Sequence, residues 1–269
     1  MAAFVQPDSR ARRSASQTGV VAACLAVLRG AASVVLAWQA AVWLFSPPRY
    51  MLPAPLDVLF VFEERGTFLL HHAGITLVEI GLGLFFGTLA GATTAIVTAA
   101  LPRTGQLIWP FVLVAQALPV FAIAPLLVLW FGLGLASKVV MTSLIIFFPV
   151  ASAFSDGLRR TDQHLLDDCA MTPATHWQTL RHVRLPLALP GLVSGLRMAA
   201  PLAPLGAVVG EWVGASGGLG FIMLQANARM RTAEVFAALI ILALLVLVLR
   251  AAVDAATVRL VPWAAETAA

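Results

Sequence analysis

Long apolar runs, with few charges inside them, constrain this chain more than any other feature. A helix needs roughly 20 mostly apolar residues to cross a hydrocarbon core about 30 Å thick. The chain is 60% apolar and 11% charged, whereas soluble domains are roughly 45–50% apolar and about 25% charged. The sequence therefore predicts an all-α membrane protein with about six transmembrane helices, over residues 20–45, 75–100, 107–131, 137–154, 187–213 and 235–258.

Basic residues fall mainly on one side of these predicted spans. With the N-terminus inside, the opposite side receives only Arg49, Arg65, Lys138, Arg229 and Arg231. Because cytoplasmic flanks carry the excess of Lys and Arg, we expect both termini in the cytoplasm. The apolar spans predict a lipid bilayer around the chain. Because this topology accounts for most of the basic bias behind the net charge of +4, we expect no nucleic-acid partner.

No linker divides the chain into separate domains. We expect a disordered cytoplasmic N-terminus over residues 1–17, one transmembrane domain over 18–263 and a short tail over 264–269. The loop 46–74 begins with several prolines, and residues 57–65 then place apolar side chains at helical spacing. This pattern predicts a short surface helix ahead of the second span.

A polar segment, residues 155–186, separates the fourth and fifth predicted spans. Apolar residues recur between its balanced charges at helical intervals, which is typical of a folded element. A first short helix should stop before Pro173, because proline disfavours continuation. A second should begin at Thr175, where Gln178 completes a capping box, and should end at Pro186. Two such helices at the membrane surface would suit a partner's groove.

A charge inside a membrane span is costly, so four charged residues within the predicted spans are candidates for a role. They are Arg29, Glu79, Arg197 and Glu211. We expect a structural ion pair between Arg197 and one of the two glutamates, in preference to substrate contact. Glu211 is nevertheless a candidate residue of a translocation pathway.

Three prolines, at positions 110, 119 and 125, interrupt the third predicted span. Each removes a backbone donor and disfavours a straight helix. The result is either a kinked packing helix or a broken backbone beside a water-filled pathway. In the second case Gln116 is a candidate pathway residue.

Catalytic and metal-binding motifs are absent from the sequence. Lys138 is the only lysine, and no phosphate-binding loop surrounds it, so this chain is not itself a P-loop ATPase. The histidines have no metal-ligand spacing. We therefore expect a transport subunit and not an enzyme, with no cofactor or metal.

The polar segment resembles the EAA loop of binding-protein-dependent ABC importer permeases. Asp167 stands at the family's Glu, Val183 at its Ile, and Leu185 with Pro186 at its Leu-Pro, all at matching spacing. There are departures: Asp168 and Cys169 replace two alanines, and Pro173 replaces the usual turn glycine. Glycine permits turn angles that proline, with φ fixed near −65°, cannot adopt. The resemblance therefore does not extend to how strongly this loop couples to its partner.

A second motif supports the same resemblance. Residues 211–220 read EWVGASGGLG, and they are similar to the Gly-rich segment after the fifth span of sulfonate, taurine, nitrate and pyrimidine-precursor permeases. The resemblance implies a type I importer of the bacterial cytoplasmic (inner) membrane. It also implies a homodimer of this permease, two ATP-binding ABC subunits and an extracytoplasmic solute-binding protein.

The resemblance assigns ATPase coupling to Asp167, Asp168, Pro173, Leu185 and Pro186. The exposed face expected for the second helix adds two residues to the same predicted site, Trp177 and Arg181.

The cargo is a narrower expectation. Residues 223–232 resemble the branch that carries thiamine-pyrimidine precursors such as hydroxymethylpyrimidine. Aliphatic sulfonate, taurine, nitrate and riboflavin-like cargo are the alternatives. An ion-coupled secondary transporter, with Glu79, Arg197 and Glu211 as its relay, is the alternative class.

Overall fold

The computed structural model describes residues 29–117 and 119–263, and every regular element within them is a helix. The predicted N-terminal segment 1–17 and the tail 264–269 lie outside the described residues. The all-α prediction is confirmed for the described part. After an apolar helix Arg29–Phe45, the elements are α2 Pro55–Ala100, α3 Pro102–Ala117, α4 Val120–Phe131, α5 Leu135–Arg159, α6 Gln163–Ala170, α7 His176–Thr179, the π-helix η1 Leu180–Arg184, α8 Leu185–Ala199, the 3₁₀-helix η2 Ala200–Leu202, α9 Ala203–Gly214, α10 Leu219–Ala228 and α11 Thr232–Leu260.

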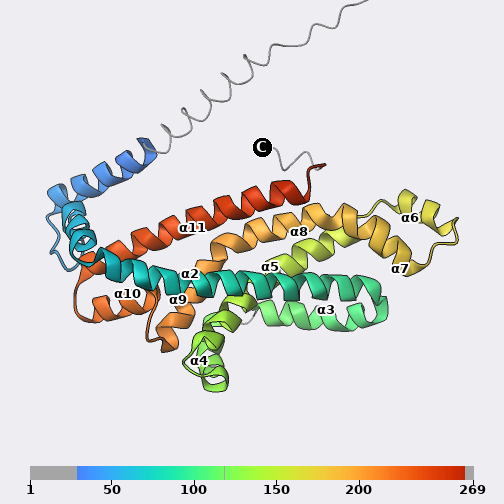
Figure 1. Cartoon of the computed structure of the whole chain (residues 1–269), viewed down its shortest axis with the longest axis horizontal. Helices are drawn as coiled ribbons and strands as arrows, with labels where there is room; N and C mark the ends of the chain where they lie inside the picture. The colour runs from blue at the N-terminus through green and yellow to red at the C-terminus, as the bar shows by residue number, and fades with distance from the viewer. Residues whose placement is uncertain (1–28, 118, 264–269) are drawn as a thin grey trace, which may run out of the picture.

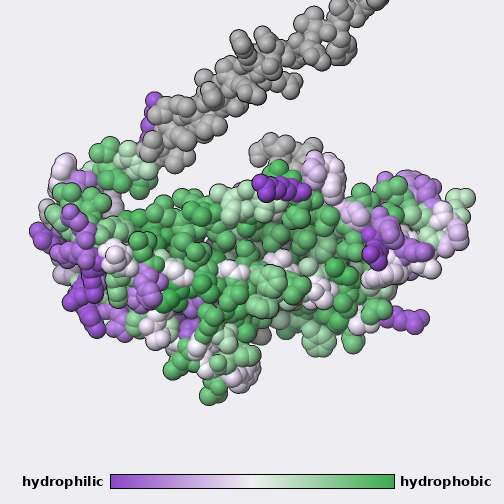
Figure 2. Space-filling view, in the orientation of Figure 1, coloured by the Kyte–Doolittle hydropathy of each residue, from purple (hydrophilic) through white to green (hydrophobic). Residues whose placement is uncertain are grey.

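Among the described residues, four helical stretches are long and apolar enough to cross a membrane. They are Pro55–Ala100, Leu135–Arg159, His176–Gly214 and Thr232–Leu260. These confirm the second, fourth, fifth and sixth predicted spans. Figure 1 shows them running along the length of the bundle, and Figure 2 shows apolar surface along its middle with polar residues gathered toward its two ends.

The third predicted span is not a single helix. Arg103–Ala117 and Val120–Phe131 are bent by 100° at the break between them, and Pro119 is the N-cap residue of α4. Proline at this place lacks the N–H that would continue the ladder of α3. The stretch 107–131 is therefore long enough to cross a membrane only if α3 and α4 together form one broken span.

Of the first predicted span, 20–45, the structure describes Arg29–Phe45, which is an apolar helix, and residues 20–28 lie outside the described part. The predicted loop 46–74 is wrong beyond residue 65, because the helix α2 that begins at Pro55 runs on to Ala100 without an intervening loop. The surface helix expected over 57–65 exists, and it continues into the second span through a kink at Arg65, where φ is −127° and ψ is 16°. The backbone N–H of Ala54 donates to the Asp57 carboxylate at 3.2 Å and closes its first turn.

Helix α5 is the centre of the packing. A stripe of glycines on α2 faces it, at positions 83, 87 and 91, and a Cβ at Gly87 would lie 2.7 Å from the carbonyl oxygen of Ser143. Small residues of this kind let membrane helices approach closely enough to gain van der Waals contact. The α2–α5 contact and the α5–α8 contact therefore form the frame to which the shorter elements attach.

Candidate functional site

The predicted coupling element consists of α6 and α7, which lie together at one end of the bundle (Figure 1). Asp162 caps α6, because its carboxylate accepts from the backbone N–H of His164 at 3.0 Å. At α7 the N–H of Gln178 donates to the Thr175 hydroxyl oxygen at 3.3 Å, and the N–H of Thr175 donates to the Gln178 side-chain oxygen at 2.8 Å. The predicted capping box at Thr175 is confirmed.

The turn between α6 and α7 holds Pro173. The Thr172 hydroxyl donates to the carbonyl of Cys169 at 2.7 Å and accepts from the N–H of Ala174 at 3.4 Å. The N–H of Met171 donates to the carbonyl of Asp167 at 3.2 Å. Side-chain and backbone bonds of this kind close the turn without a glycine.

The predicted coupling residues lie mostly on the outer surface of this element. Asp167, Asp168, Pro173 and Arg181 are exposed, and Trp177 is 53% exposed. Gln163 donates to the Asp167 carboxylate at 3.0 Å. Leu185 and Pro186 are half-buried at the base. An exposed Trp next to exposed charges on two short capped helices is a surface that a protein partner can bind.

The prediction that the second helix ends at Pro186 is wrong. Helix α7 continues through η1 into α8, so one helical path runs over His176–Gly214. In η1 the N–H of Leu185 donates to the carbonyl of Leu180, five residues back. This wider turn comes directly before Pro186, whose ring would otherwise clash with a carbonyl of the preceding turn. The coupling element and the fifth span are therefore mechanically continuous.

The base of this helix is buried among the spans. Leu180 is fully buried and packs in one cluster with Ala95 of α2, Phe154 and Leu158 of α5, and Ala188 of α8. Arg184 reaches from the end of η1 to α5, where its Nε and Nη2 donate to the carbonyl of Leu158 at 3.3 and 2.9 Å. Sequence reasoning missed the contact of Arg184, since nothing in the spacing indicates which span it meets.

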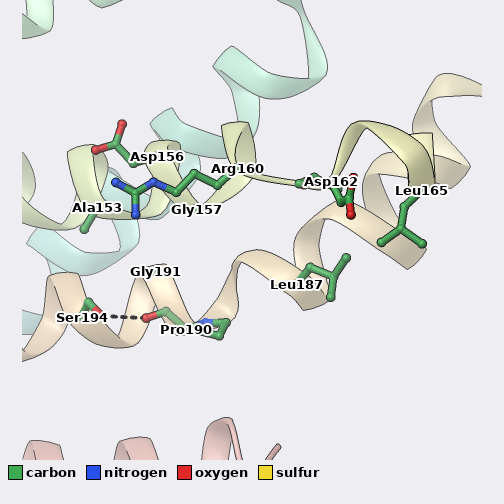
Figure 3. Close-up of a pocket in the computed structure, with 11 residues that line it drawn as sticks. Ala153, Asp156, Gly157, Arg160, Asp162, Leu165, Leu187, Pro190, Gly191 and Ser194 are labelled. Atoms are coloured by element: carbon green, nitrogen blue, oxygen red, sulfur yellow. Dashed lines mark hydrogen bonds between the residues drawn. The ribbon is translucent and has the colours of Figure 1, made fainter. Parts of the chain in front are cut away.

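A cleft of about 510 Å³ opens beside this base, between α5, α6 and α8 (Figure 3). Its lining combines charged side chains from the end of α5 and the start of α6 with small and apolar residues of α8. The charged members are Asp156, Arg160 and Asp162. The cleft leaves room between the first coupling helix and the spans.

The two predicted pathway residues lie in different surroundings. Gln116 is exposed near the end of α3, next to the break in the third span. Glu211 is 1% exposed. The Thr76 hydroxyl donates to Glu211 Oε1 at 2.6 Å, and the N–H of Gly220 donates to Oε2. Glu211 thus joins α2, α9 and α10 inside the protein, and its role in a pathway stays a prediction.

The Gly-rich segment closes over this glutamate. Gly218 has φ of +106° and ψ of 167°, and its N–H donates to His72 Nδ1 at 3.0 Å. The N–H of Leu219 donates to the Thr76 hydroxyl oxygen at 2.8 Å. A Cβ at Gly218 would lie 2.2 Å from the Glu211 carboxyl carbon. The segment therefore needs glycine for both its backbone angles and its close approach.

The predicted ion pair of Arg197 with a glutamate is also wrong. Arg197 Nε contacts Asp254 of α11 at 3.0 Å, and Arg250 Nε contacts the same carboxylate at 2.8 Å. Lys138 instead lies near Glu79 and Glu211, and all three side chains are buried. Its ammonium donates to the carbonyls of Leu133, Gly134 and Gly214, the last two at 2.9 and 2.7 Å.

These features define a membrane protein with an exposed two-helix element at one end of its bundle. Sequence comparison gives its family. Residues 83–266 match the binding-protein-dependent transport system inner membrane component family. The chain belongs to this family and is an ABC importer permease subunit, as the sequence predicted. The ion-coupled secondary transporter, the alternative class, is set aside by this membership.

Three relatives and a solved structure agree with this class. A probable ABC transporter permease protein of Haemophilus influenzae is 47% identical over 82% of this chain and 90% of its own length. The riboflavin transport system permease protein RibX of Chloroflexus aurantiacus is 37% identical, covering 85% and 86%. The formylaminopyrimidine transport permease protein ThiX of Halalkalibacterium halodurans is 32% identical, covering 86% and 92%. A chain of the inward-facing MetNI methionine ABC transporter has the same fold, with a TM-score of 0.64 at 22% identity over 74% of this chain and 98% of that chain.

Proposed function

We propose that α6 and α7 are the docking site of separate ATP-binding subunits, and that ATP hydrolysis on those subunits drives import through this chain. The observation that carries the proposal is the continuous helix from the exposed α7 to the end of α9. A partner that binds Trp177 and moves α7 also moves the fifth span, because no loop separates them. Asp167, Asp168, Pro173 and Arg181 form the rest of the contact surface, with Leu185 and Pro186 at its base.

The full importer contains two copies of this permease, two ATP-binding subunits and an extracytoplasmic solute-binding protein. We assign the packing of the second copy to an open apolar groove of about 1100 Å³ between α2, α4 and α5. The pathway lies between the copies, with Gln116 and Glu211 as its candidate residues.

Uptake into vesicles tests this class of transport. The chain, co-expressed with the ATP-binding and solute-binding subunits encoded beside it, should support solute uptake that requires ATP and persists when an ionophore collapses the ion gradients. Uptake that stops with the ionophore and continues without ATP would contradict the proposal.

The proposed cargo is a thiamine-pyrimidine precursor such as hydroxymethylpyrimidine. Its support is the run 223–232 together with the relative named for formylaminopyrimidine transport. The relatives named for riboflavin, aliphatic sulfonate and taurine transport keep those solutes as alternatives. Nitrate stays an alternative from the resemblance of residues 211–220. Calorimetric titration of the cognate solute-binding protein with each solute decides among them, since tight binding of a sulfonate alone would overturn the pyrimidine assignment.

The proposed orientation places α6, α7 and both termini in the cytoplasm. Cys169 is a natural reporter, because it is a free, half-buried thiol on α6. In a Cys24→Ser background, a membrane-impermeant maleimide should label Cys169 in inside-out vesicles and leave it unlabelled in right-side-out vesicles. The reverse pattern would invert the topology.

A further inference from the structure

The junction between the coupling element and the spans is made by two helices, and only one of them is covalently continuous with α7. Helix α8 follows α7 through η1 without a break. Helix α5 ends at Arg159 and is connected to the same element only through a turn and α6. A displacement of α7 therefore reaches α8 through the helix backbone, whereas it needs a non-covalent contact to reach α5 directly.

Arg184 supplies the hydrogen-bonded part of that contact, beside the apolar packing of Leu180 in one cluster with Phe154 and Leu158. Its guanidinium donates twice to the Leu158 carbonyl, at 3.3 and 2.9 Å. This carbonyl belongs to the last turn of α5, whose carbonyls lack donors within the helix. A cation there is also favoured by the helix dipole. The Thr161 hydroxyl is a weaker third donor to the same oxygen at 3.3 Å.

The packing around this contact leaves little freedom for sliding. Leu158 is 1% exposed and Leu180 is fully buried, and both belong to the cluster that includes Phe154 and Ala188. The wide turn of η1 ends at Arg184 and aims its side chain at α5. π-Turns of this kind occur frequently at functional sites.

Neighbouring arginines do not share this position. The Arg159 guanidinium lies over the Trp109 ring, 5.0 Å from its centroid. Arg160 lines the cleft between α5, α6 and α8 (Figure 3). Arg181 is exposed on the coupling surface. Of the described arginines near the junction, Arg184 is the one that bonds the coupling helix to the end of α5.

We propose that Arg184 is a positioning residue that fixes the cytoplasmic end of α5 to the coupling helix, so that one movement of the ATP-binding subunits displaces α5 and α8 together. The inference rests on the proposed function, since it needs a partner that moves α7. It predicts that losing the Arg184 contact uncouples α5 from the ATP-driven movement, while docking at α7 persists.

Electron–electron distance measurements on the assembled transporter test this directly. In a Cys24→Ser, Cys169→Ser background, one spin-label pair at His176→Cys, an exposed position of α7, and Arg160→Cys, at the C-cap of α5, reports α7 against α5. A second pair at His176→Cys and Leu187→Cys reports α7 against α8. We expect both distances to stay the same between the nucleotide-free and vanadate-trapped states when Arg184 is present.

With Arg184→Gln, the α7–α5 distance should change on trapping, while the α7–α8 distance should stay fixed. Stimulation of ATP hydrolysis by the solute-binding protein should fall by about tenfold, in keeping with the loss of a charge-assisted hydrogen bond. Arg184→Lys keeps the charge without the two-donor fork and should fall in between. Arg103→Gln, which removes an exposed arginine of α3, is the matched control and should match the wild type.

The possible outcomes test the role of Arg184 and the proposed function separately. If the wild-type chain recruits no ATP-binding subunit, the proposed function fails. If Arg184→Gln recruits the subunits and keeps both the fixed α7–α5 distance and full stimulation, the function stands and the role of Arg184 is overturned. If Arg184→Gln lowers both thermal stability and stimulation while the two distances stay unchanged, Arg184 is a structural residue only.

Discussion

The two ends of the bundle use polar residues in opposite ways. At the end that carries α6 and α7, Asp167, Asp168 and Trp177 face outward. At the other end, Glu211 is buried and accepts from Thr76 of α2 and Gly220 of α10. Lys138 is buried there too, and it donates to carbonyls of the α4–α5 turn and of the end of α9. A polar residue between apolar spans is therefore not by itself a sign of a partner or a substrate. A polar side chain that is buried and hydrogen-bonded stabilises the fold, whereas an exposed one is available to a partner.

Gly218→Ala should have the largest effect on the buried end. A Cβ would meet the Glu211 carboxyl group at 2.2 Å, and the backbone angles of φ +106° and ψ 167° strongly favour glycine. We expect a loss of about 4 kcal/mol in unfolding free energy from strain and overpacking together. Thermal unfolding in detergent checks this. Gly74→Ala, where a Cβ meets open space, is the control and should stay within about 1 kcal/mol of the wild type.

Glu211→Ala should have the next largest effect. It leaves the N–H of Gly220 without its buried acceptor, and it leaves the Thr76 hydroxyl only the longer bond to the His72 carbonyl at 3.3 Å, at a total cost of about 3 kcal/mol. The same measurement on Asp167→Ala, an exposed carboxylate, should give a change below about 0.5 kcal/mol. Equal losses of stability in the two variants would remove the distinction between the two ends.

Trp177→Ala tests the exposed end. The side chain is 53% exposed, so thermal stability should stay almost unchanged while affinity for the ATP-binding subunits falls about tenfold or more. Binding of the solubilised permease to immobilised ATP-binding subunit measures this. If the variant expresses poorly and still binds normally, Trp177 is a packing residue instead.

Thr175→Ala should have the smallest effect. It removes the capping box of α7, which is worth about 1 kcal/mol of local helix stability. We expect faster amide exchange over α7 and no change over α5, as read by hydrogen–deuterium exchange. Exchange that rises equally in both helices would mean that the cap supports the whole bundle.

The sequence predicted the elements that depend on local pattern. Apolar length located the second, fourth, fifth and sixth spans, and the Thr175 capping box located α7, because each rests on neighbouring residues. The partners of Arg197 and Glu211 were not accessible in this way. Arg197 meets Asp254 and Glu211 meets Thr76 through the packing of helices that lie far apart in the sequence.

The sequence also failed to predict where helices break and where they continue. Proline marks where a helix is weakened, yet its consequence depends on the surroundings. At Pro119 the chain turns by 100°, whereas at Pro186 the preceding π-turn absorbs the ring and the helix continues. The kink at Arg65 has no proline beside it, and Gly66, which follows it, is too weak a signal by itself to place a kink.

Recruitment of ATP-binding subunits is the most direct test of the proposal that α6 and α7 are their docking site. The chain is co-expressed with those subunits and purified by a tag on the permease, as the wild type and as a variant with residues 167–186 scrambled. We predict that the wild type retains the ATP-binding subunits and that the scrambled chain, although inserted in the membrane, loses them. A wild-type permease that purifies without them, or a scrambled one that keeps them, would contradict the account.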